Sequence, residues 1–584
     1  MNPHIYITYD MVFDDEPKTI TEYLKEFDRT SLIKIALLLI QSSDKYEGIV
    51  EYFSDFFCKD NIGFASSVLE KLQKRLQEKD EEPSSMIPKS YFLISETTGL
   101  ELLRQIFSIE KFSIPAPQII QEQNLFKAIL LVNGLVSKTI VKEEYTEKGD
   151  LSDLFFAKSL FCTFLNNYES NNIGPEYLVI LQVIKGYYFF KYCENSKLKE
   201  HLRLFLERNG LSSWEQYLYN AIKLLLFPLK NKKGYAKIVL NEEREGYSFL
   251  HSHAMQIETV VSIDKNNDYT FFKAHPLIEL DSNTFLPINT LFCINALYKS
   301  IYFEFKSIND QLKGTELYIK GLRTVFTTEF SEQYLFDTFI QKTLKRRRGI
   351  KLSDIDCKRI ANIGHEPDFY YRDGNNILLF ENKDIMIADY LKHRGNYEDI
   401  WEAVKKKLVV EAGLSQILHN IKSIDAGNFV WDKKLPKHPR VYPVLVLDDI
   451  SLCVPGLNYI LNNVLSDLLK EQNIGIKVFP LAIIELDTLI AFANDFETGK
   501  YSLKEVLDKY YAHMNHQPKQ VGPNQVIKEV FKKYFPFNPQ NMLTSHLATS
   551  FLMKFVRLFA KLLRRMITDL EWCTSVNAYL HLTM

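Results

Sequence analysis

The chain has 584 residues, of which 46% are hydrophobic and 25% charged, as is typical of a globular protein with about two to four domains. A net charge of −2 excludes a protein that binds nucleic acid through overall positive charge, so such a surface would have to be local. Seven scattered cysteines without a CxxC pair predict reduced thiols and a cytoplasmic location, and they argue against a zinc knuckle. The N-terminus does not read as a signal peptide, and the apolar run at 32–40 is too short for a bilayer, so we expect no membrane span.

Residues 1–230 are predicted to form a mainly helical N-terminal region. Apolar residues recur there at the spacing of one helix face. The segment 78–85 is charged and rich in turn formers, which indicates a linker. No catalytic constellation is evident in this region, so recognition of DNA, of a protein partner or of a trigger stays open as its role. The clearest helices are predicted at 31–41, 47–57, 64–77 and 177–192.

Residues 231–315 are predicted to form a β-rich segment that ends in a helix. Runs of β-branched and aromatic residues separated by turn formers indicate short strands. His251 and His253 would share one face of a strand, but no cysteine or carboxylate partner lies nearby in sequence, so we expect no metal site there. The strands are predicted at 236–240, 258–264, 269–274 and 284–288, with a turn at 266–268 and a helix at 291–305.

The most informative segment is a predicted hairpin at 365–383. Two β-forming runs flank an Asp-Gly turn at 372–375, which is a strong hairpin signal. Glu381 and Lys383 are two residues apart on the second strand, so they point to the same face, and the hairpin brings Asp368 towards that face. Two carboxylates and a lysine at a sheet edge would hold a divalent metal and act on a phosphodiester.

The flanking segments predict a mixed α/β core around this hairpin. A helix that begins near residue 328 carries Glu332, with Glu329 one turn away as a rival, and a later amphipathic helix carries Gln416 and Asn420 on one face. The strand–helix–strand order at 441–484 predicts at least one parallel pair. Further features are a helix at 334–344, strands at 441–447 and 477–484, and a helix at 455–470. The basic cluster at 345–348 suits a helix end with solvated charges, and a phosphate contact stays open for it. Asp448 and Asp449 end a strand, where aspartates mostly serve turns, although a strand end could also approach a site.

Pro367-Asp368, followed by Glu381-x-Lys383, resembles the PD-(D/E)xK nuclease superfamily, whose members share a restriction-endonuclease-like fold. The resemblance covers roughly residues 320–490. It implies that Asp368, Glu381 and Glu332 bind Mg²⁺, for which Mn²⁺ substitutes. It also implies that Lys383 orients the attacking water and stabilises negative charge, and that Gln416 positions substrate or water.

The resemblance therefore implies a metal-dependent deoxyribonuclease, with DNA as its partner. The large accessory half suggests a bacterial restriction or antiviral defence system by analogy. Two alternatives stay open: a catalytically inactive nuclease-like protein that assembles with partners or binds nucleic acid, and a transposase subunit. A protein partner of the N-terminal half and a homodimer are further expectations.

The expected fold class is multidomain α+β: a largely helical N-terminal half with a β-rich segment, a restriction-endonuclease-like α/β core and a helical C-terminus. The domain boundaries are expected at 1–230, 231–315, 316–495 and 496–584. At 551–566 an apolar stripe lies beside a face of lysines and arginines. A helix that follows phosphates, a helix at a membrane surface and a helix packed on the core stay open for this segment.

Overall fold

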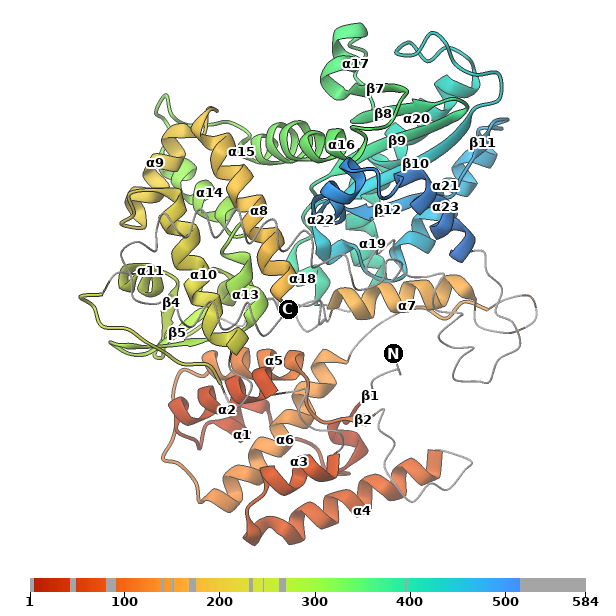
Figure 1. Ribbon diagram of the computed structural model, residues 1–584. Helices are drawn as coiled ribbons and strands as arrows, with labels where there is room; N and C mark the ends of the chain where they lie inside the picture. Colours follow the sequence, from red (N-terminus) through yellow and green to blue (C-terminus); the bar gives the residue numbers. More distant parts are fainter. Residues whose placement is uncertain are drawn as a thin grey trace.

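The computed structural model describes residues 5–42, 49–79, 91–137, 141–145, 147, 149, 152–166, 175–230, 235–244, 246–261, 269–393 and 396–514. These residues form an N-terminal helical group, a second helical group with a four-stranded sheet, and a six-stranded sheet between helices (Figure 1). The α+β class is thus confirmed. None of the described helices is long and apolar enough to cross a membrane. The predicted turn at 266–268 and the amphipathic segment at 551–566 lie outside the described residues.

The N-terminal group packs around a core of aliphatic and phenylalanine side chains. Helices α2 and α5 approach each other closely, because a Cβ on Gly99 would lie 2.7 Å from the side chain of Ile40. Ser95 caps α5 through a capping box with Thr98. The predicted helices at 31–41 and 64–77 are confirmed. Of the helix predicted at 47–57, the structure describes residues 49–57, and α3 covers 49–56. The elements are β1 (Ile5–Tyr6), α1 (Ile20–Leu24), α2 (Arg29–Ser42), α3 (Ile49–Phe56), α4 (Ile62–Lys79), β2 (Tyr91–Phe92), α5 (Glu96–Phe107) and α6 (Gln118–Val136).

The second helical group is built on α8, the apolar helix predicted at 177–192. Its Phe189 ring contacts Phe305, Phe326 and Phe330, with ring centroids 4.8–5.3 Å apart. This aromatic contact attaches the helix that carries Glu332 to the accessory half of the chain. The elements are α8 (Pro175–Glu194), α9 (Lys199–Arg208), α10 (Trp214–Lys230), α11 (Tyr247–Ser252), α12 (Thr270–Ala274), α13 (Thr290–Asn295), α14 (Ile301–Gln311), α15 (Leu322–Thr324), the π-helical segment η5 (Val325–Phe336) and α16 (Asp337–Thr343).

A four-stranded sheet separates the cores of the two helical groups. Successive strand residues point to opposite faces, so Leu277 and Phe285 enter the core of the second group, whereas Ile278 and Leu286 enter the N-terminal core. Strands β5 and β6 form an antiparallel hairpin, and β4 joins β5 in parallel. The order is β3-β6-β5-β4, with β3 (Ile238–Val239), β4 (Ala254–Gln256), β5 (Leu277–Asp281) and β6 (Thr284–Pro287).

Three strand assignments in this segment were wrong. The apolar run at 269–274 forms helix α12, residues 258–261 form turn and irregular backbone, and His251 lies on helix α11 rather than on a strand. The run at 269–274 is too short to show a period, so β propensity alone does not separate helix from strand. His251 instead contacts Glu279 on β5, with Nδ1 2.9 Å from Oε2. The strands predicted at 236–240 and 284–288 are confirmed.

The six-stranded sheet has both faces buried. Strands β7, β8 and β9 are antiparallel neighbours, and β9, β10 and β12 run parallel, so the predicted parallel pair is confirmed. The run predicted as one strand at 477–484 is divided at Pro480, which has no N–H for the ladder. The strands are β7 (Ile350–Ser353), β8 (Phe369–Asp373), β9 (Asn376–Lys383), β10 (Arg440–Leu447), β11 (Lys477–Val478) and β12 (Ala482–Glu485).

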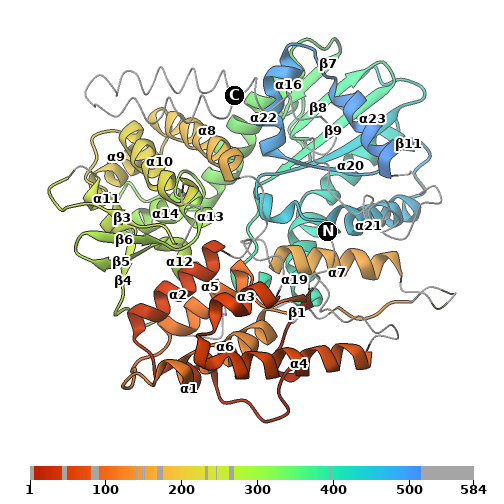
Figure 2. The same ribbon diagram turned by 60° about the horizontal axis from the view of Figure 1, so that its bottom comes forward.

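Helices cover the two faces of this sheet. Phe380 and Val444 face the core shared with η5, α16 and α22, whereas Leu379 and Leu445 face α19, α20 and α21. Helix α7 lies beside α19 on the latter side, below the sheet (Figures 1 and 2). The elements are α7 (Asp153–Asn166), α17 (Asp354–Ile360), α18 (Asp389–Lys392), α19 (Tyr397–Lys405), η6 (Lys406–Val410), α20 (Leu414–Asp425), α21 (Leu457–Glu471), α22 (Leu486–Glu497) and α23 (Leu503–Met514).

Candidate metal and phosphodiester site

The acidic and lysine side chains predicted from the sequence meet at the open end of the β8–β9 hairpin. The register pairs Phe369 with Phe380, so the next residues outward, Asp368 and Glu381, lie opposite each other on one face of the sheet. Lys383 follows two residues later and therefore points to the same face. Its Nζ lies 3.2 Å from Asp368 Oδ2 and 3.0 Å from Glu381 Oε2. The three side chains thus converge, as the hairpin pattern predicted.

A two-residue turn holds the hairpin together. Gly374 adopts a φ of +57° there, which glycine tolerates without steric cost. At the other end, Asp368 Oδ2 accepts the backbone N–H of Asn382 at 2.6 Å. The backbone carbonyl of Asp368 accepts the N–H of Asp354 at 3.1 Å, which fixes the start of α17 against the hairpin. Asp368 is therefore held by backbone groups on both sides.

Burial makes this an unusual place for ionised groups. Glu381 is 1% exposed, and apart from the ion pair with Lys383 its carboxylate oxygens have no hydrogen-bond partner among the described residues. Burial, and then the charge of Asp368, raise the pKa of Glu381 well above its ordinary value. Burial alone would lower the pKa of Lys383, but attraction to Asp368, Glu381 and Glu332 outweighs it and raises that pKa. Lys383 is thus an ammonium in this arrangement, which does not suit it to act as a general base.

Glu332 is the third acidic group of the centre. Burial, and then repulsion from Asp368, raise the pKa of Glu332 to about 9. The rival Glu329, one turn earlier, instead pairs with Lys197 and accepts the Tyr192 hydroxyl at 3.1 Å. Of the two glutamates on η5, Glu332 is therefore the one beside the hairpin. We refer to Asp368, Glu381, Lys383 and Glu332 as the carboxylate–lysine centre.

Gln416 lies half-buried on α20, the helix that packs its apolar face on the sheet beside β9. Among the described residues, Gln416 makes no hydrogen bond or ion pair with the carboxylate–lysine centre. Asn420, one turn later, is buried, and both of its amide atoms lack hydrogen-bond partners there. His419, the residue before Asn420, packs its ring on His365 with ring centroids 4.2 Å apart, which fixes α20 near the start of the hairpin.

Sequence reasoning missed a buried charge network behind the centre. Asp448 donates its N–H to the carbonyl of Lys383 at 3.2 Å, and its carboxylate accepts the hydroxyl of Ser331, the neighbour of Glu332, at 3.0 Å. Lys185 of α8 forms ion pairs with Asp448 and Asp487, at 2.5 and 2.6 Å. The sequence signal was present, because Lys185 is a lone charge within the apolar middle of α8. Asp449 serves the turn after β10, as expected, by accepting the N–H of Ser451 at 3.0 Å, and both Asp448 and Asp449 also pair with lysines from the accessory half.

Two residues of the basic cluster at 345–348 contact other parts of the fold through their side chains. Lys345 lies 2.6 Å from Glu497 on α22, and Arg347 donates to the carbonyl of Tyr501 at 3.0 Å. These contacts match the interpretation as a structural helix end better than as a phosphate contact.

The donor set of the centre fits a hard divalent cation in its chemistry. Three carboxylates supply oxygen, which Mg²⁺ prefers, and the two oxygens of Glu381 are buried without hydrogen bonds. Within the described residues, however, no three histidine, cysteine or acidic side chains are grouped closely enough to hold a metal ion. Lys383 takes the place between Asp368 and Glu381 and neutralises part of their charge. Metal binding would thus require Lys383 to withdraw from the carboxylates and Glu332 to ionise.

No family model, curated protein or solved structure matches this chain. What the carboxylate–lysine centre does must therefore be inferred from its own residues and geometry.

Proposed function

We propose that this protein is a metal-dependent nuclease of the PD-(D/E)xK type that hydrolyses phosphodiester bonds, with DNA as its substrate. The observation that carries the proposal is the convergence of Asp368, Glu381 and Lys383 on one face of the hairpin, with Glu332 beside them. The order of elements adds support, because the helix with Glu332 precedes the hairpin and the helix with Gln416 follows it. The choice of DNA rests on family resemblance alone.

Each residue has a role that follows from its surroundings. The ammonium of Lys383 would stabilise negative charge that develops on the scissile phosphate. Asp368, Glu381 and Glu332 would hold Mg²⁺ through oxygen ligands. A bound Mg²⁺ would lower the pKa of a coordinated water and stabilise charge on the phosphate. Because Lys383 retains its proton, it would orient the water rather than deprotonate it.

The test is cleavage of supercoiled plasmid, linear duplex, single-stranded DNA and RNA with Mg²⁺ or Mn²⁺. Asp368→Ala and Lys383→Ala should each abolish cleavage. Asp373→Ala is the matched control, because Asp373 lies on the same hairpin but is exposed at the turn. If cleavage survives both substitutions at the centre, the assignment is wrong. If the wild type cleaves none of these substrates with either metal, the result favours a nuclease-like protein without catalytic activity.

One observation favours a second candidate, a nuclease-like protein that binds partners or nucleic acid without catalysis. The centre is nearly closed, since Glu381 is 1% exposed and the side chain of Lys383 only 12%. Lys383 also bridges both carboxylates, as a purely structural ion cluster would. Under this alternative, binding of DNA would be unaffected by Asp368→Ala, and added Mg²⁺ would not stabilise the fold.

A further inference from the structure

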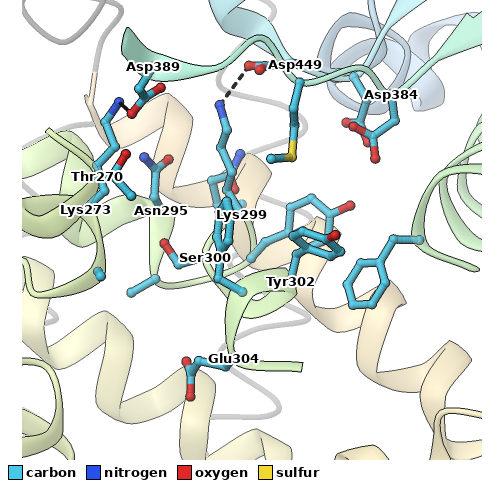
Figure 3. Close-up of a pocket in the computed structure, with 18 of the residues that line it drawn as sticks. Thr270, Lys273, Asn295, Lys299, Ser300, Tyr302, Glu304, Asp384, Asp389 and Asp449 are labelled. Carbon is cyan, nitrogen blue, oxygen red and sulfur yellow. Dashed lines mark hydrogen bonds and ion pairs between the residues drawn. The ribbon is translucent and has the colours of Figure 1, made fainter. Parts of the chain in front are cut away.

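A cavity of about 1110 Å³ lies between the accessory half and the ends of β9 and β10. One wall comes from α12, α13, α14 and η5, and the other from the loop at 384–389, which follows Lys383 directly (Figure 3). Asp448 and Asp449 close one end. None of the four residues of the carboxylate–lysine centre lines this cavity, so it needs an explanation of its own.

Three of the lysines that line the cavity, Lys273, Lys299 and Lys392, lie beside two of its lining carboxylates, Asp389 and Asp449. Lys273 pairs with Asp389, and Lys299 Nζ lies 2.7 Å from Asp449 (Figure 3). The third, Lys392, is 4% exposed, and its Nζ donates to a serine hydroxyl at 3.0 Å while lying 3.7 and 4.0 Å from the two carboxylates. Within this group of five side chains, the three ammonium groups exceed the two carboxylates by one charge, and Lys392 is the most buried of the three lysines.

The pKa of Lys392 reflects the positive charges around it. Burial lowers the pKa of Lys392, and the nearby charges of Lys299 and Lys273 lower it further, although Asp449 and Asp389 oppose them. Lys407, also at the cavity, donates to a backbone carbonyl, and burial again lowers its pKa. An anion bound at Lys392 would compensate its ammonium group, because charge-assisted hydrogen bonds are strongest where water is excluded.

The rest of the cavity offers planar and polar partners. Tyr302 and Phe303 line it from α14, and Phe303 is 51% exposed although it is a large apolar ring. Gln182 also lines the cavity, and its buried side-chain oxygen has no hydrogen-bond partner in the described residues. Exposed aromatic rings stack on nucleobases, and an amide oxygen accepts from their exocyclic amino groups.

We propose that this cavity binds a nucleotide, with a phosphate at Lys392 and its lysine neighbours and the base against Tyr302 and Phe303. The volume lies just above the range of about 300–1,000 Å³ that is usual for small-ligand sites, so a dinucleotide would fit. The source of the nucleotide is either a free ligand or the end of a nucleic acid strand. Because binding needs neither metal nor cleavage, the proposal stands or falls separately from the nuclease function.

Binding should be measured on the full chain in EDTA with ATP, a 5′-phosphorylated deoxydinucleotide, inorganic phosphate and a fluorescein-labelled 20-mer of thymidine. Lys392→Met removes the buried ammonium but keeps most of its volume, and Phe303→Ser removes an exposed ring that the fold does not need. Lys470→Met is the matched control, because that lysine is 75% exposed on α21 and does not line the cavity. A circular dichroism melt of each variant checks folding.

We expect the dissociation constant of the nucleotide to rise at least about tenfold in Lys392→Met and to rise in Phe303→Ser, with no change in Lys470→Met. Tight binding of ATP or the dinucleotide alone would identify a free ligand, whereas tight binding of the 20-mer that the dinucleotide displaces would identify a strand end. The proposal is overturned if no probe binds the wild type, or if folded Lys392→Met and Phe303→Ser bind as the wild type does. Phosphate binding as tight as nucleotide binding would also overturn it, since the base would then contribute nothing.

Discussion

The substitution Glu332→Gln should make the metal-free protein more stable at neutral pH. In the folded protein the pKa of Glu332 is about 9, whereas its ordinary value is 4.5. At pH 7 the unfolded chain therefore ionises this group while the folded chain keeps it protonated. The difference of about 2.5 units between pH 7 and the ordinary pKa, at about 1.36 kcal/mol per unit, corresponds to about 3 kcal/mol. Glutamine has nearly the same shape and cannot ionise, so the variant avoids this loss.

The sign of the pH dependence follows from the same shift. A group whose pKa is raised on folding contributes its full stability below the unfolded value of 4.5 and loses it as pH rises towards about 9. Between pH 5 and pH 7 the wild type should thus lose about 2.5 kcal/mol of unfolding free energy that Glu332→Gln retains. Added metal should narrow this difference: at a concentration 100 times its dissociation constant it would stabilise the wild type by about 2.7 kcal/mol and the variant by less.

Chemical denaturation at pH 5 and pH 7, with EDTA and then with Mg²⁺ or Mn²⁺, measures these quantities. Glu329→Gln is the matched control on the same helix, because Glu329 pairs with Lys197 and Tyr192 outside the centre. The reasoning is refuted if Glu332→Gln and the wild type have equal stability at pH 7 in EDTA, since Glu332 would then be ionised in the folded protein. Equal stabilisation of both proteins by metal would instead show that Glu332 is not a metal ligand.

Three further outcomes are expected. If the protein cleaves DNA, Lys383→Met should lower the rate by about 10²–10³-fold, and Lys383→Arg should restore part of it, because charge rather than proton transfer is at stake; equal rates in the two variants would contradict this role. Lys185→Met should destabilise the fold by about 3–5 kcal/mol in denaturant titrations, because Asp448 and Asp487 would remain buried without their cation. Gly349→Ala should cost about 1–3 kcal/mol, since Gly349 has a φ of +128° and a Cβ would lie 2.2 Å from the Arg372 carbonyl oxygen. Gly63→Ala is the control, because its added methyl would meet nothing within 4 Å. Thermal melts should therefore show a lower melting temperature for Gly349→Ala and no decrease for Gly63→Ala.

The hairpin could be predicted from sequence because several local signals agreed. The Asp-Gly turn, the apolar run at 377–380 and the period of two together determine which residues share a face. Once the register is set, the contact of Lys383 with Asp368 and Glu381 follows without knowledge of the rest of the chain. The strand–helix–strand order after it was equally local, so the parallel pair of β10 and β12 was also predictable.

What could not be predicted depends on packing between distant segments. The apolar run at 269–274 became helix α12, which places Phe272 in the N-terminal core, and no pattern within those six residues requires that outcome. The choice between Glu329 and Glu332 needed the position of Lys197, which lies in the turn between α8 and α9. Asp448 and Asp449 looked like turn residues because their partners, Lys185 and Lys299, lie far away in sequence.

These long-range contacts bear on why a hairpin with nuclease-like residues carries so large an accessory half. The carboxyl ends of β9 and β10 hold Lys383 in place, and two ion pairs from the accessory half reach these ends: Lys185 with Asp448, and Lys299 with Asp449. A third pair, Arg323 with Asp384, comes from α15, directly before η5. Buried pairs of this kind do little for net stability, but breaking one leaves an uncompensated charge, so they fix a geometry. The accessory half would therefore set the position of the centre, and a ligand in the cavity beside these pairs would act on that position directly.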